Sequence, residues 1–316
     1  MRSPVLTFLN GLSRSTRLAG TIWSHPANRG RQMSALLKAF TWQLDKRLRN
    51  RPWIVPFHGL KLICYPDSTS SSAVVYFNGL PDYWEMSFLH AYLRAGDHVL
   101  DVGANVGIYT VLAAARVGPR GSVDALEPQE AAAARIEAQA SLNGLRNIRV
   151  HRCAASDRSE TAAFGYSDES ATMHLRRESE ASGDGTQVST IRLDDLQPSK
   201  RYALGKMDIE GAESLALRGA VDRLRHANPP VWLLEMAGYS KLYGVSTEEL
   251  IASLADAGFE TAVWDPETRR LRYTKTPWTL GVQNVLAVAR ERAQDVAIRA
   301  NAMLQPKRMT APVEGG

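Results

Sequence analysis

Acidic residues stand at the ends of successive short apolar runs in the central part of this chain. Asp101 ends the first run, Glu127 and Asp157 end the next two, and Asp208 and Glu235 end two later ones. Short apolar runs that alternate with amphipathic segments are typical of buried parallel strands. Parallel strands bring their carboxyl ends to one edge of a sheet, where such folds bind ligands. We therefore expect these carboxylates to surround one binding site.

The first run opens directly into a glycine-containing turn. The stretch DVGANVGIYT begins at Asp101 and contains Gly103, Ala104, Asn105 and Gly107. Glycine permits a sharp backbone turn and the close approach of a ligand. A dinucleotide fingerprint carries a middle glycine that admits a pyrophosphate, and this turn lacks one. The carboxylate would also repel a diphosphate, whereas it suits the sulfonium and amino groups of S-adenosylmethionine.

Two further acids fit the nucleoside end of such a cofactor. Glu127, followed by Pro128, can accept hydrogen bonds from both ribose hydroxyls, a trait that NAD enzymes share. Asp157 can accept a hydrogen bond from the adenine amino group, with the amide beside it at Ser156 completing the contact. Each acid alone is more often a loop carboxylate or a helix cap, so the prediction depends on their combination.

The densest group of acids lies in KMDIEGAE, at the end of the fourth run. Asp208 and Glu210 are two residues apart, so on an extended backbone they share one face. Glu213 falls in the first turn of the following helix, where the helix dipole favours an acid. We expect Asp208 and Glu210 to be functional, Glu235 to be a base or a substrate contact, and Glu213 to be a structural helix acid.

The elements that position these acids form an α/β pattern. Alternating strands and helices predict a mostly parallel sheet with helices on both faces. The expected strands cover residues 98–102, 122–127, 148–154, 205–209, 231–236, 260–264 and 282–289. The expected helices cover residues 83–93, 106–116, 129–142, 213–225 and 247–257. Between residues 157 and 187 the alternation stops in an insertion rich in Ser, Gly and Glu.

These motifs, in this order, resemble the FkbM family of S-adenosylmethionine-dependent methyltransferases. The similarity covers roughly residues 75–290 and is carried by DVGANVG, ALEP, AASD, the LDDL step at residues 193–196 and KMDIEGAE. The resemblance implies a class I, Rossmann-like methyltransferase sheet of seven strands with an antiparallel last strand. It also implies S-adenosylmethionine as the cofactor. The family is known mainly for O-methylation of hydroxyls on sugars, polyketides and related metabolites, and we expect such a reaction here.

The resemblance further implies roles for individual residues. Those expected around the methionine part of the cofactor are Asp101, Gly103, Asn105, Gly107, Tyr109 and Thr110. Glu127 would hold the ribose and Asp157 the adenine end, while Glu85 matches a family acid near the cofactor pocket. Asp208 and Glu210 would line the methyl-transfer centre. We expect the acceptor pocket in the basic N-terminal segment and the 160–187 insertion, where family members diverge.

Methyl transfer to a hydroxyl requires alignment of the acceptor oxygen and removal of its proton. We expect Asp208 first, and Glu235 second, to act as the base. His151 and His174 are weaker candidates, because a lone histidine is usually structural. We expect no metal, since no further ligand set accompanies Asp208 and Glu210. Two other functions stay open: an NAD-dependent oxidoreductase on a similar fold, and a non-catalytic cofactor-binding module.

The charge is concentrated at the N-terminal end. The formal net charge is +5, yet residues 1–60 hold ten Lys or Arg and a single acid, Asp45. We expect residues 1–32 to be irregular and residues 33–50 to form an amphipathic helix. Its apolar stripe comprises Met33, Leu36, Leu37, Phe40, Leu44 and Leu48. We expect the stripe to dock on the main domain or to form a homodimer rather than to bind a membrane, and we expect no nucleic-acid binding.

The same reasoning predicts a division of the chain. An N-terminal extension at 1–75, with a hairpin at 53–65 and a loop at 68–72, precedes a methyltransferase domain at 76–290. A polar tail at 291–316 is expected to fray. No apolar run is long enough to span a membrane. Two cysteines, Cys64 and Cys153, support neither a disulfide framework nor a zinc site, so we expect a cytoplasmic protein.

Overall fold

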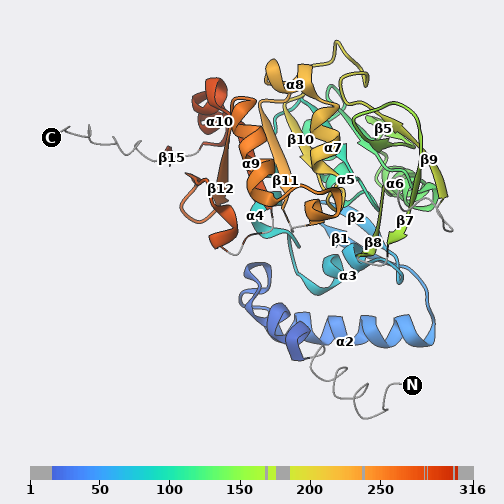
Figure 1. Ribbon diagram of the computed structural model, residues 1–316. Coiled ribbons are helices and arrows are strands. Elements are labelled where there is room, and N and C mark those ends of the chain that lie inside the picture. Colours follow the sequence, from blue (N-terminus) through green and yellow to red (C-terminus); the bar gives the residue numbers. More distant parts are fainter. Residues whose placement is uncertain are drawn as a thin grey trace.

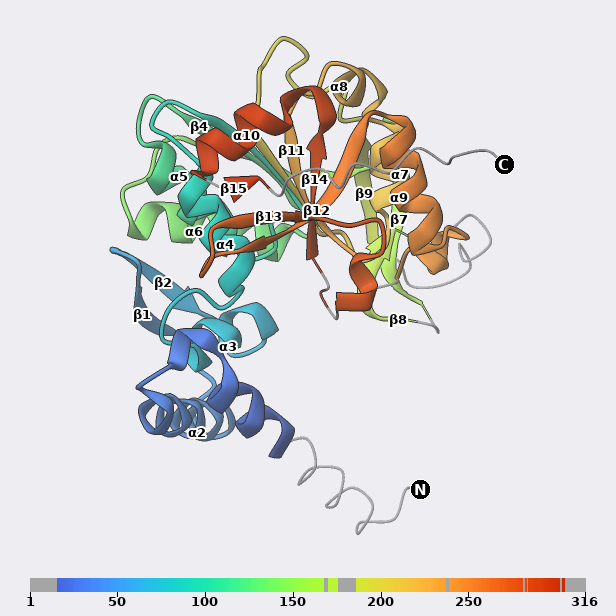
Figure 2. The ribbon, with the colours of Figure 1, turned by 90° about the vertical axis from the view of Figure 1, so that its left-hand side faces the viewer.

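In the computed structural model, a large twisted sheet forms the centre of the molecule, with helices on both of its faces (Figures 1 and 2). The structure describes residues 16–167, 170–175, 186–236, 239–280, 282, 284–301 and 303–304. Among these residues, no helix is long and apolar enough to cross a membrane.

The strands of this sheet follow the order β15-β13-β12-β14-β11-β10-β3-β4-β5. Their bounds are β3 His98–Val102, β4 Ser122–Leu126, β5 Ile148–His151, β10 Leu204–Met207, β11 Val231–Glu235, β12 Phe259–Asp265, β13 Arg270–Tyr273, β14 Asn284–Ala289 and β15 Met303–Leu304. Each of the seven predicted strands is present. Numbered along the chain, these seven lie in the order 3-2-1-4-5-7-6, and the last, β14, is antiparallel to both neighbours as predicted. β13 and β15 extend the sheet beyond the predicted seven strands.

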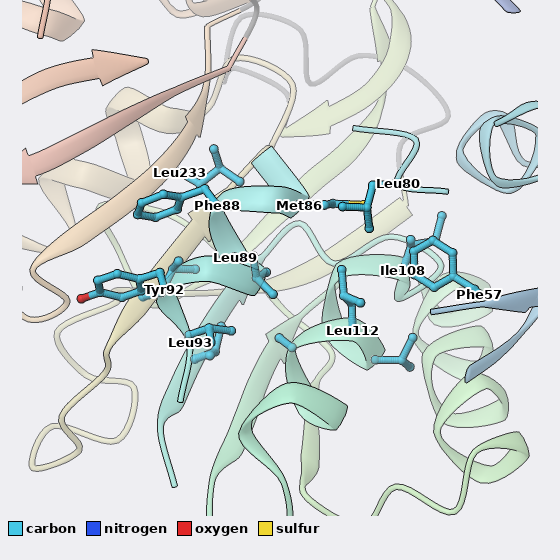
Figure 3. Packing of buried hydrophobic residues seen from close by; sticks show 14 of the residues in the cluster. Phe57, Leu80, Met86, Phe88, Leu89, Tyr92, Leu93, Ile108, Leu112 and Leu233 are labelled. Atoms are coloured by element: carbon cyan, nitrogen blue, oxygen red, sulfur yellow. The ribbon is translucent and has the colours of Figure 1, made fainter. Parts of the chain in front are cut away.

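Two apolar layers hold the helices on the sheet. On one face lie α4 (Tyr83–Tyr92), α5 (Ile108–Val117) and α10 (Ala293–Ala300); on the other lie α7 (Glu213–Arg218), α8 (Val221–Arg225) and α9 (Thr247–Asp256). Figure 3 shows the first layer, in which Phe88 and Leu89 of α4 pack between Leu233 of the sheet and Leu112 of α5. α6 (Glu130–Leu142) packs beside α5 and β5.

The single helix predicted at residues 213–225 is two helices, α7 and α8, separated at Gly219. A Cβ at Gly219 would lie 2.0 Å from the carbonyl oxygen of Ser156, so the backbones are in close contact here. The carbonyl of Gly219 also accepts a hydrogen bond from the amide of Asp194, outside the helix. These two contacts explain the break.

The predicted insertion forms a second sheet of four strands in the order β6-β9-β7-β8. Their bounds are β6 Ala154–Ala155, β7 Thr161–Ser167, β8 Ser170–Leu175 and β9 Thr186–Ile191. Short 3-10 turns complete the chain: η1 Pro26–Asn28, η3 Tyr239–Tyr243, η4 Pro277–Leu280 and η5 Arg290–Arg292.

The N-terminal region is more regular than predicted. Residues 16–24 are helical, and α2 (Gln32–Leu48) is followed by the predicted hairpin, β1 (Trp53–Phe57) with β2 (Leu60–Cys64). The expected loop at residues 68–72 is wrong, because the side chain of Ser68 accepts a hydrogen bond from the amide of Ser71 and begins helix α3 (Thr69–Tyr76). The fraying predicted for the tail is also wrong for α10, whose Val296 and Ala297 are buried.

Helix α2 docks through a face that the apolar pattern did not predict. Ala35, Ala39 and Trp42 are buried in the core, and the indole nitrogen of Trp42 donates a hydrogen bond to Ser72 of α3 over 3.1 Å. Of the predicted stripe, only Leu36 packs against this core. The other five members are exposed, so the expectation that the stripe docks on the main domain is wrong. Small residues at 35 and 39 allow α2 to approach α3 closely.

We predict that Trp42→Ala lowers the free energy of unfolding by about 3–5 kcal/mol, because the substitution leaves a cavity in a fully buried site. Leu37→Ala, on the exposed face of the same helix, should change it by less than about 0.5 kcal/mol. Urea denaturation followed by tryptophan fluorescence and circular dichroism measures both values. Equal losses in the two variants would contradict this orientation of α2.

Candidate functional site

The glycine turn, which connects β3 to α5, packs against the end of β10. Gly103, Asn105 and Gly107 all have positive φ, at 77°, 52° and 85°. A Cβ at Gly103 would lie 1.9 Å from the carbonyl oxygen of Asp208, and one at Gly107 would lie 3.2 Å from the Cα of Ile136. Both positions therefore need glycine for backbone conformation and for packing. The turn is thereby fixed directly beside the KMDIEGAE segment.

Glu127 fixes the other side of this turn. One carboxylate oxygen accepts a hydrogen bond from the amide of Asn105 over 2.8 Å, and the other accepts one from the amide of Gln129 over 2.9 Å. Burial raises the pKa of Glu127, while these two amides act in the opposite direction. Each oxygen keeps a lone pair, so the carboxylate can still accept hydrogen bonds from a diol.

A buried lysine lies where the strand ends meet. Lys206 Nζ lies 3.3 Å from a carboxylate oxygen of Asp208 and 3.7 Å from Oδ1 of Asp101, and it donates a hydrogen bond to the carbonyl of Gly103 over 3.2 Å. Burial lowers the pKa of Lys206, but the carboxylates of Asp208 and Asp101 outweigh it, and the pKa is raised. Lys206 is therefore an ammonium ion that offsets part of the negative charge at the site.

Asp101 lies behind the turn rather than in an open space. Its side chain accepts a hydrogen bond from the hydroxyl of Thr110 over 2.6 Å and is 2% exposed. Burial raises its pKa, and Lys206 acts against this. Oδ1 of Asp101 has no hydrogen-bond partner among the described residues. Asp101 lines none of the cavities described below, so it supports the turn and Lys206 from behind and does not border the predicted methionine position.

Asp208 and Glu235 form a hydrogen-bonded carboxyl pair across the ends of β10 and β11. Burial and the adjacent charge of Asp208 raise the pKa of Glu235. The raised pKa favours the protonated form of Glu235, whose hydroxyl then donates the hydrogen bond to the Asp208 carboxylate beside Lys206.

Three neighbouring cavities open along this edge. We call the first, of about 750 Å³, the rim cavity; its predicted lining residues are Gly103, Asn105, Glu127, Pro128, Asp208, Glu210 and Glu235. The inner cavity, of about 110 Å³, is lined by Ala104, Tyr109 and Lys206. The side cavity, of about 770 Å³, lies between α4 and the β12–β14 strands and is lined by Glu85. Asp208 lines both the rim and inner cavities, and Asp82 lines both the inner and side cavities, so the three are adjacent.

Some predicted site residues lie outside these cavity walls. Gly107 and Thr110 support the turn from behind. Ser156 and Asp157 are not brought into the cavities; Asp157 instead pairs with Arg218 over 3.4 Å. The wall beside them is formed by Cys153, Ala154 and Ala155. Asp157 is directed away because the next helix, α7, supplies it with a cationic partner.

The structure adds residues that the pattern of acids did not indicate. Lys206 is the most central, and its place within an apolar strand is a signal that could have revealed it. Asp82 is half-buried beside the inner cavity and hydrogen-bonds with Tyr109, and burial raises its pKa. Arg135 and Phe164 also line the rim cavity. These two residues come from helix α6 and strand β7, which are distant in sequence, so no local motif would predict their contacts.

Two further acids singled out from the sequence, Glu85 and Glu213, are buried or half-buried beside the site. Burial raises the pKa of Glu85 to about 7, and its carboxyl hydrogen-bonds with Asn284. Glu213 is the predicted helix acid: it accepts hydrogen bonds from the amides of Ile209 and Gly211 at 3.0 and 3.4 Å.

No group of three or more His, Cys, Asp or Glu among the described residues is arranged to hold a metal ion. The side chain of His174 lies outside what the structure describes.

One comparison with known proteins identifies the family of this chain. The methyltransferase FkbM domain matches residues 101–261, just over half of the chain. No curated protein matches the sequence.

Solved structures that resemble the chain include a SAM-dependent methyltransferase from Aquifex aeolicus, with 17% identity, 66% of this chain and 95% of that chain covered, and a TM-score of 0.35. Precorrin-6y C5,15-methyltransferase from Geobacter metallireducens shares 14% identity over 66% and 89% of the two chains, with a TM-score of 0.37. Fibrillarin from Aeropyrum pernix, with bound S-adenosyl-L-methionine, shares 15% sequence identity over 65% of this chain and 73% of that chain, with a TM-score of 0.35. These sequence identities and TM-scores are too low to support an inference about function.

The strand order and the family match together define a class I methyltransferase that uses S-adenosylmethionine. More particularly, the chain belongs to the FkbM methyltransferase family. The NAD-dependent alternative is set aside on this match. The donor set fits the cofactor, because carboxylates gathered around one buried ammonium suit a ligand with a cationic sulfur and a zwitterionic amino-acid end.

We predict a pH-dependent effect for Glu213→Gln. Burial raises the pKa of Glu213 from its ordinary value of 4.5 to about 7, so the folded state holds this proton more tightly than the unfolded state. The stabilisation is full below pH 4.5 and is lost as the pH rises through about 7. The difference in free energy of unfolding between the variant and the wild type should therefore shift in favour of the variant by up to about 3 kcal/mol from acidic to alkaline pH.

Urea denaturation between pH 4.5 and about 8 measures this difference, with Glu130→Gln as the matched control. Glu130 is also a first-turn helix acid but is exposed. A pH-independent difference for Glu213→Gln would contradict the buried, protonated state.

Proposed function

We propose that the chain transfers a methyl group from S-adenosylmethionine to a hydroxyl oxygen of a sugar, glycan or secondary metabolite. The observation that carries this proposal is the carboxylate of Asp208, which lines the rim cavity, lies 3.3 Å from Lys206 Nζ and hydrogen-bonds with Glu235. A hydroxyl acceptor must lose a proton during transfer, and a carboxylate held in this way is suited to accept it.

The site residues that we propose for the cofactor follow from the cavity walls. Glu127 would accept hydrogen bonds from the ribose hydroxyls, and the glycine turn would border the methionine part. Lys206 and Asp82 lie at the inner cavity with opposite charges, which suits the carboxylate and ammonium of an amino acid. The adenine end would lie near Ala154 and Ala155, with Asp157 as a predicted contact that the rim-cavity wall does not include.

When bound, S-adenosylmethionine supplies a methyl group activated by its positively charged sulfur. The protein must then align the acceptor hydroxyl with the methyl group and remove the proton of that hydroxyl. Asp208 is the proposed base, because Lys206 holds its carboxylate in place and Glu235 hydrogen-bonds with it. Glu210 lines the same cavity and is the second proposed residue of the methyl-transfer centre.

The acidic surroundings favour a neutral acceptor. The carboxylates of Asp208 and Glu210 line the rim cavity, so a carboxylate or a phosphate would meet like charges there. A carboxylate acceptor would also need no base. A hydroxyl group is neutral and gains from a carboxylate that accepts its proton, which supports O-methylation.

We propose the side cavity as the acceptor pocket. Trp84 and Trp264 line it together with Asp265 and Arg270. Aromatic faces beside carboxylate and guanidinium groups suit a sugar, which presents both apolar C–H faces and hydroxyls. This pocket lies outside the N-terminal segment and the 160–187 insertion, where the sequence led us to expect it.

We predict that one substitution weakens cofactor binding and that another lowers turnover without weakening cofactor binding. Glu127→Gln should weaken S-adenosylmethionine binding about tenfold, because it loses a charge-assisted acceptor for the ribose. Asp208→Asn should leave that affinity within about threefold but lower turnover by about 10²–10⁴-fold. Isothermal titration measures the first quantity, and release of S-adenosylhomocysteine with a panel of sugar and polyol acceptors measures the second.

Glu130→Gln, a substitution of an exposed glutamate on the adjacent helix, is the control and should change neither quantity. Binding without turnover by the wild type on every acceptor would favour the non-catalytic module instead. Equal loss of affinity in both variants would contradict the separate roles of Glu127 and Asp208.

A further inference from the structure

Helix α2 presents a continuous apolar face to solvent. The exposed members of the sequence stripe are Met33 (70% exposed), Leu37 (67%), Phe40 (66%), Leu44 (45%) and Leu48 (73%). Their spacing of three and four residues places them in one row along the helix. A 17-residue helix is about 25 Å long, so the row forms an extended ridge.

This exposure is a property of a well-docked helix. Trp42 on the opposite face is completely buried and hydrogen-bonds with Ser72, and Gln43 donates a hydrogen bond to the hydroxyl of Tyr76. These contacts fix the rotation of α2 about its axis. Figures 1 and 2 show α2 along one edge of the molecule, with α3 and the β1–β2 hairpin between it and the large sheet.

The elements next to α2 in the chain carry further exposed apolar side chains. Trp23 in the preceding helix is 52% exposed and Ile54 in the following strand is 61% exposed. Tryptophan, phenylalanine and leucine exposed on one module are the residues that interfacial membrane helices use for insertion.

The charges of the module that carries this ridge are mostly positive. The cations of residues 16–60 are Arg17, Arg29, Arg31, Lys38, Lys46, Arg47, Arg49 and Arg51. Of these, Lys46 lies on the docked side of α2, 3.4 Å from Ser72, Lys38 is half-buried, and Arg29 pairs with Glu267 over 3.2 Å, so the exposed arginines carry the charge offered to a partner. The single acid of the same range, Asp45, is buried; it accepts a hydrogen bond from the indole of Trp53 over 2.7 Å and pairs with Arg49 and Arg51. It therefore offers no negative charge to an approaching partner.

An apolar ridge among cations selects its partner by charge. A second copy of this chain would bring a cationic surface against a cationic surface, which opposes association. A nucleic acid would match the charge but would leave the apolar side chains without a partner. A bilayer that contains anionic lipids satisfies both features, because the headgroups attract the Lys and Arg side chains while the acyl region accepts the apolar row.

In place of the homodimer that the sequence led us to expect, we propose that α2 binds the surface of an anionic lipid bilayer, with its axis parallel to the surface and Met33, Leu37, Phe40, Leu44 and Leu48 inserted. The inference does not depend on the identity of the methyl acceptor. It also places the active site near the bilayer, because α3, on which α2 packs, contributes Ser70 to the walls of both the rim and inner cavities.

Vesicle co-sedimentation tests this proposal with the full chain. Vesicles of phosphatidylcholine mixed with phosphatidylglycerol should bind the wild type at least tenfold more tightly than vesicles of phosphatidylcholine alone, and added salt should weaken the binding. Phe40→Glu and Leu37→Glu should each reduce binding at least tenfold. Ile298→Glu on α10, where an equally exposed apolar residue is replaced by the same acid, is the matched control and should bind as the wild type.

Circular dichroism and S-adenosylmethionine titration establish that the variants are folded. Failure of the wild type to bind anionic vesicles, or equal binding by Phe40→Glu and the wild type, would overturn the proposal. A dimer in sedimentation equilibrium that Phe40→Glu dissociates would assign the ridge to a second copy, which would likewise overturn it.

Discussion

The buried ammonium of Lys206 is the interaction on which the site depends. It lies within 4 Å of carboxylate oxygens from two strand ends, those of Asp101 and Asp208, and also binds the carbonyl of Gly103. Without a cation, the buried carboxylate of Asp101 and the half-buried carboxylate of Asp208 would repel each other. Removing one partner of a buried ion pair is strongly destabilising, typically by about 3–5 kcal/mol. The lysine thus allows acids at the ends of β3 and β10 to lie close together.

The rest of the site follows from the way the sheet is wound. β3, β4, β10 and β11 are neighbours and run in parallel, so their carboxyl ends lie at one edge. The glycine turn fits there because no side chain at position 103 stands between β3 and Asp208. Glu127 then ties the turn to the end of β4. The result is an acidic space with the buried ammonium of Lys206 beside it, which suits a cationic methyl donor.

Much of the fold could be predicted from the sequence, because buried strands and amphipathic helices leave strong local patterns. The strands around DVGANVG and KMDIEGAE are present with boundaries within a few residues of those expected. The failures occur where a local pattern has two meanings. Serines at 68–72 suggested a loop, but Ser68 caps a helix. The apolar row of α2 suggested a buried face, but alanines and Trp42 make the contact instead.

The candidate site could be predicted only in part, because only some of its residues leave a local pattern in the sequence. Acids at strand ends are visible in the sequence, and Asp208, Glu127 and Glu235 do line one cavity. Lys206 and Asp82 were missed because a single charged residue next to an apolar segment has many ordinary explanations. Asp157 was expected at the adenine end, yet only the three-dimensional structure reveals Arg218 beside it.

A crystal structure with S-adenosylhomocysteine tests the central claim most directly. We predict that both ribose hydroxyls lie within hydrogen-bonding distance of Glu127, that the amino-acid end lies beside Lys206, and that the sulfur faces Asp208. A ligand bound elsewhere, or one whose sulfur is remote from the Asp208–Glu235 pair, would contradict the account.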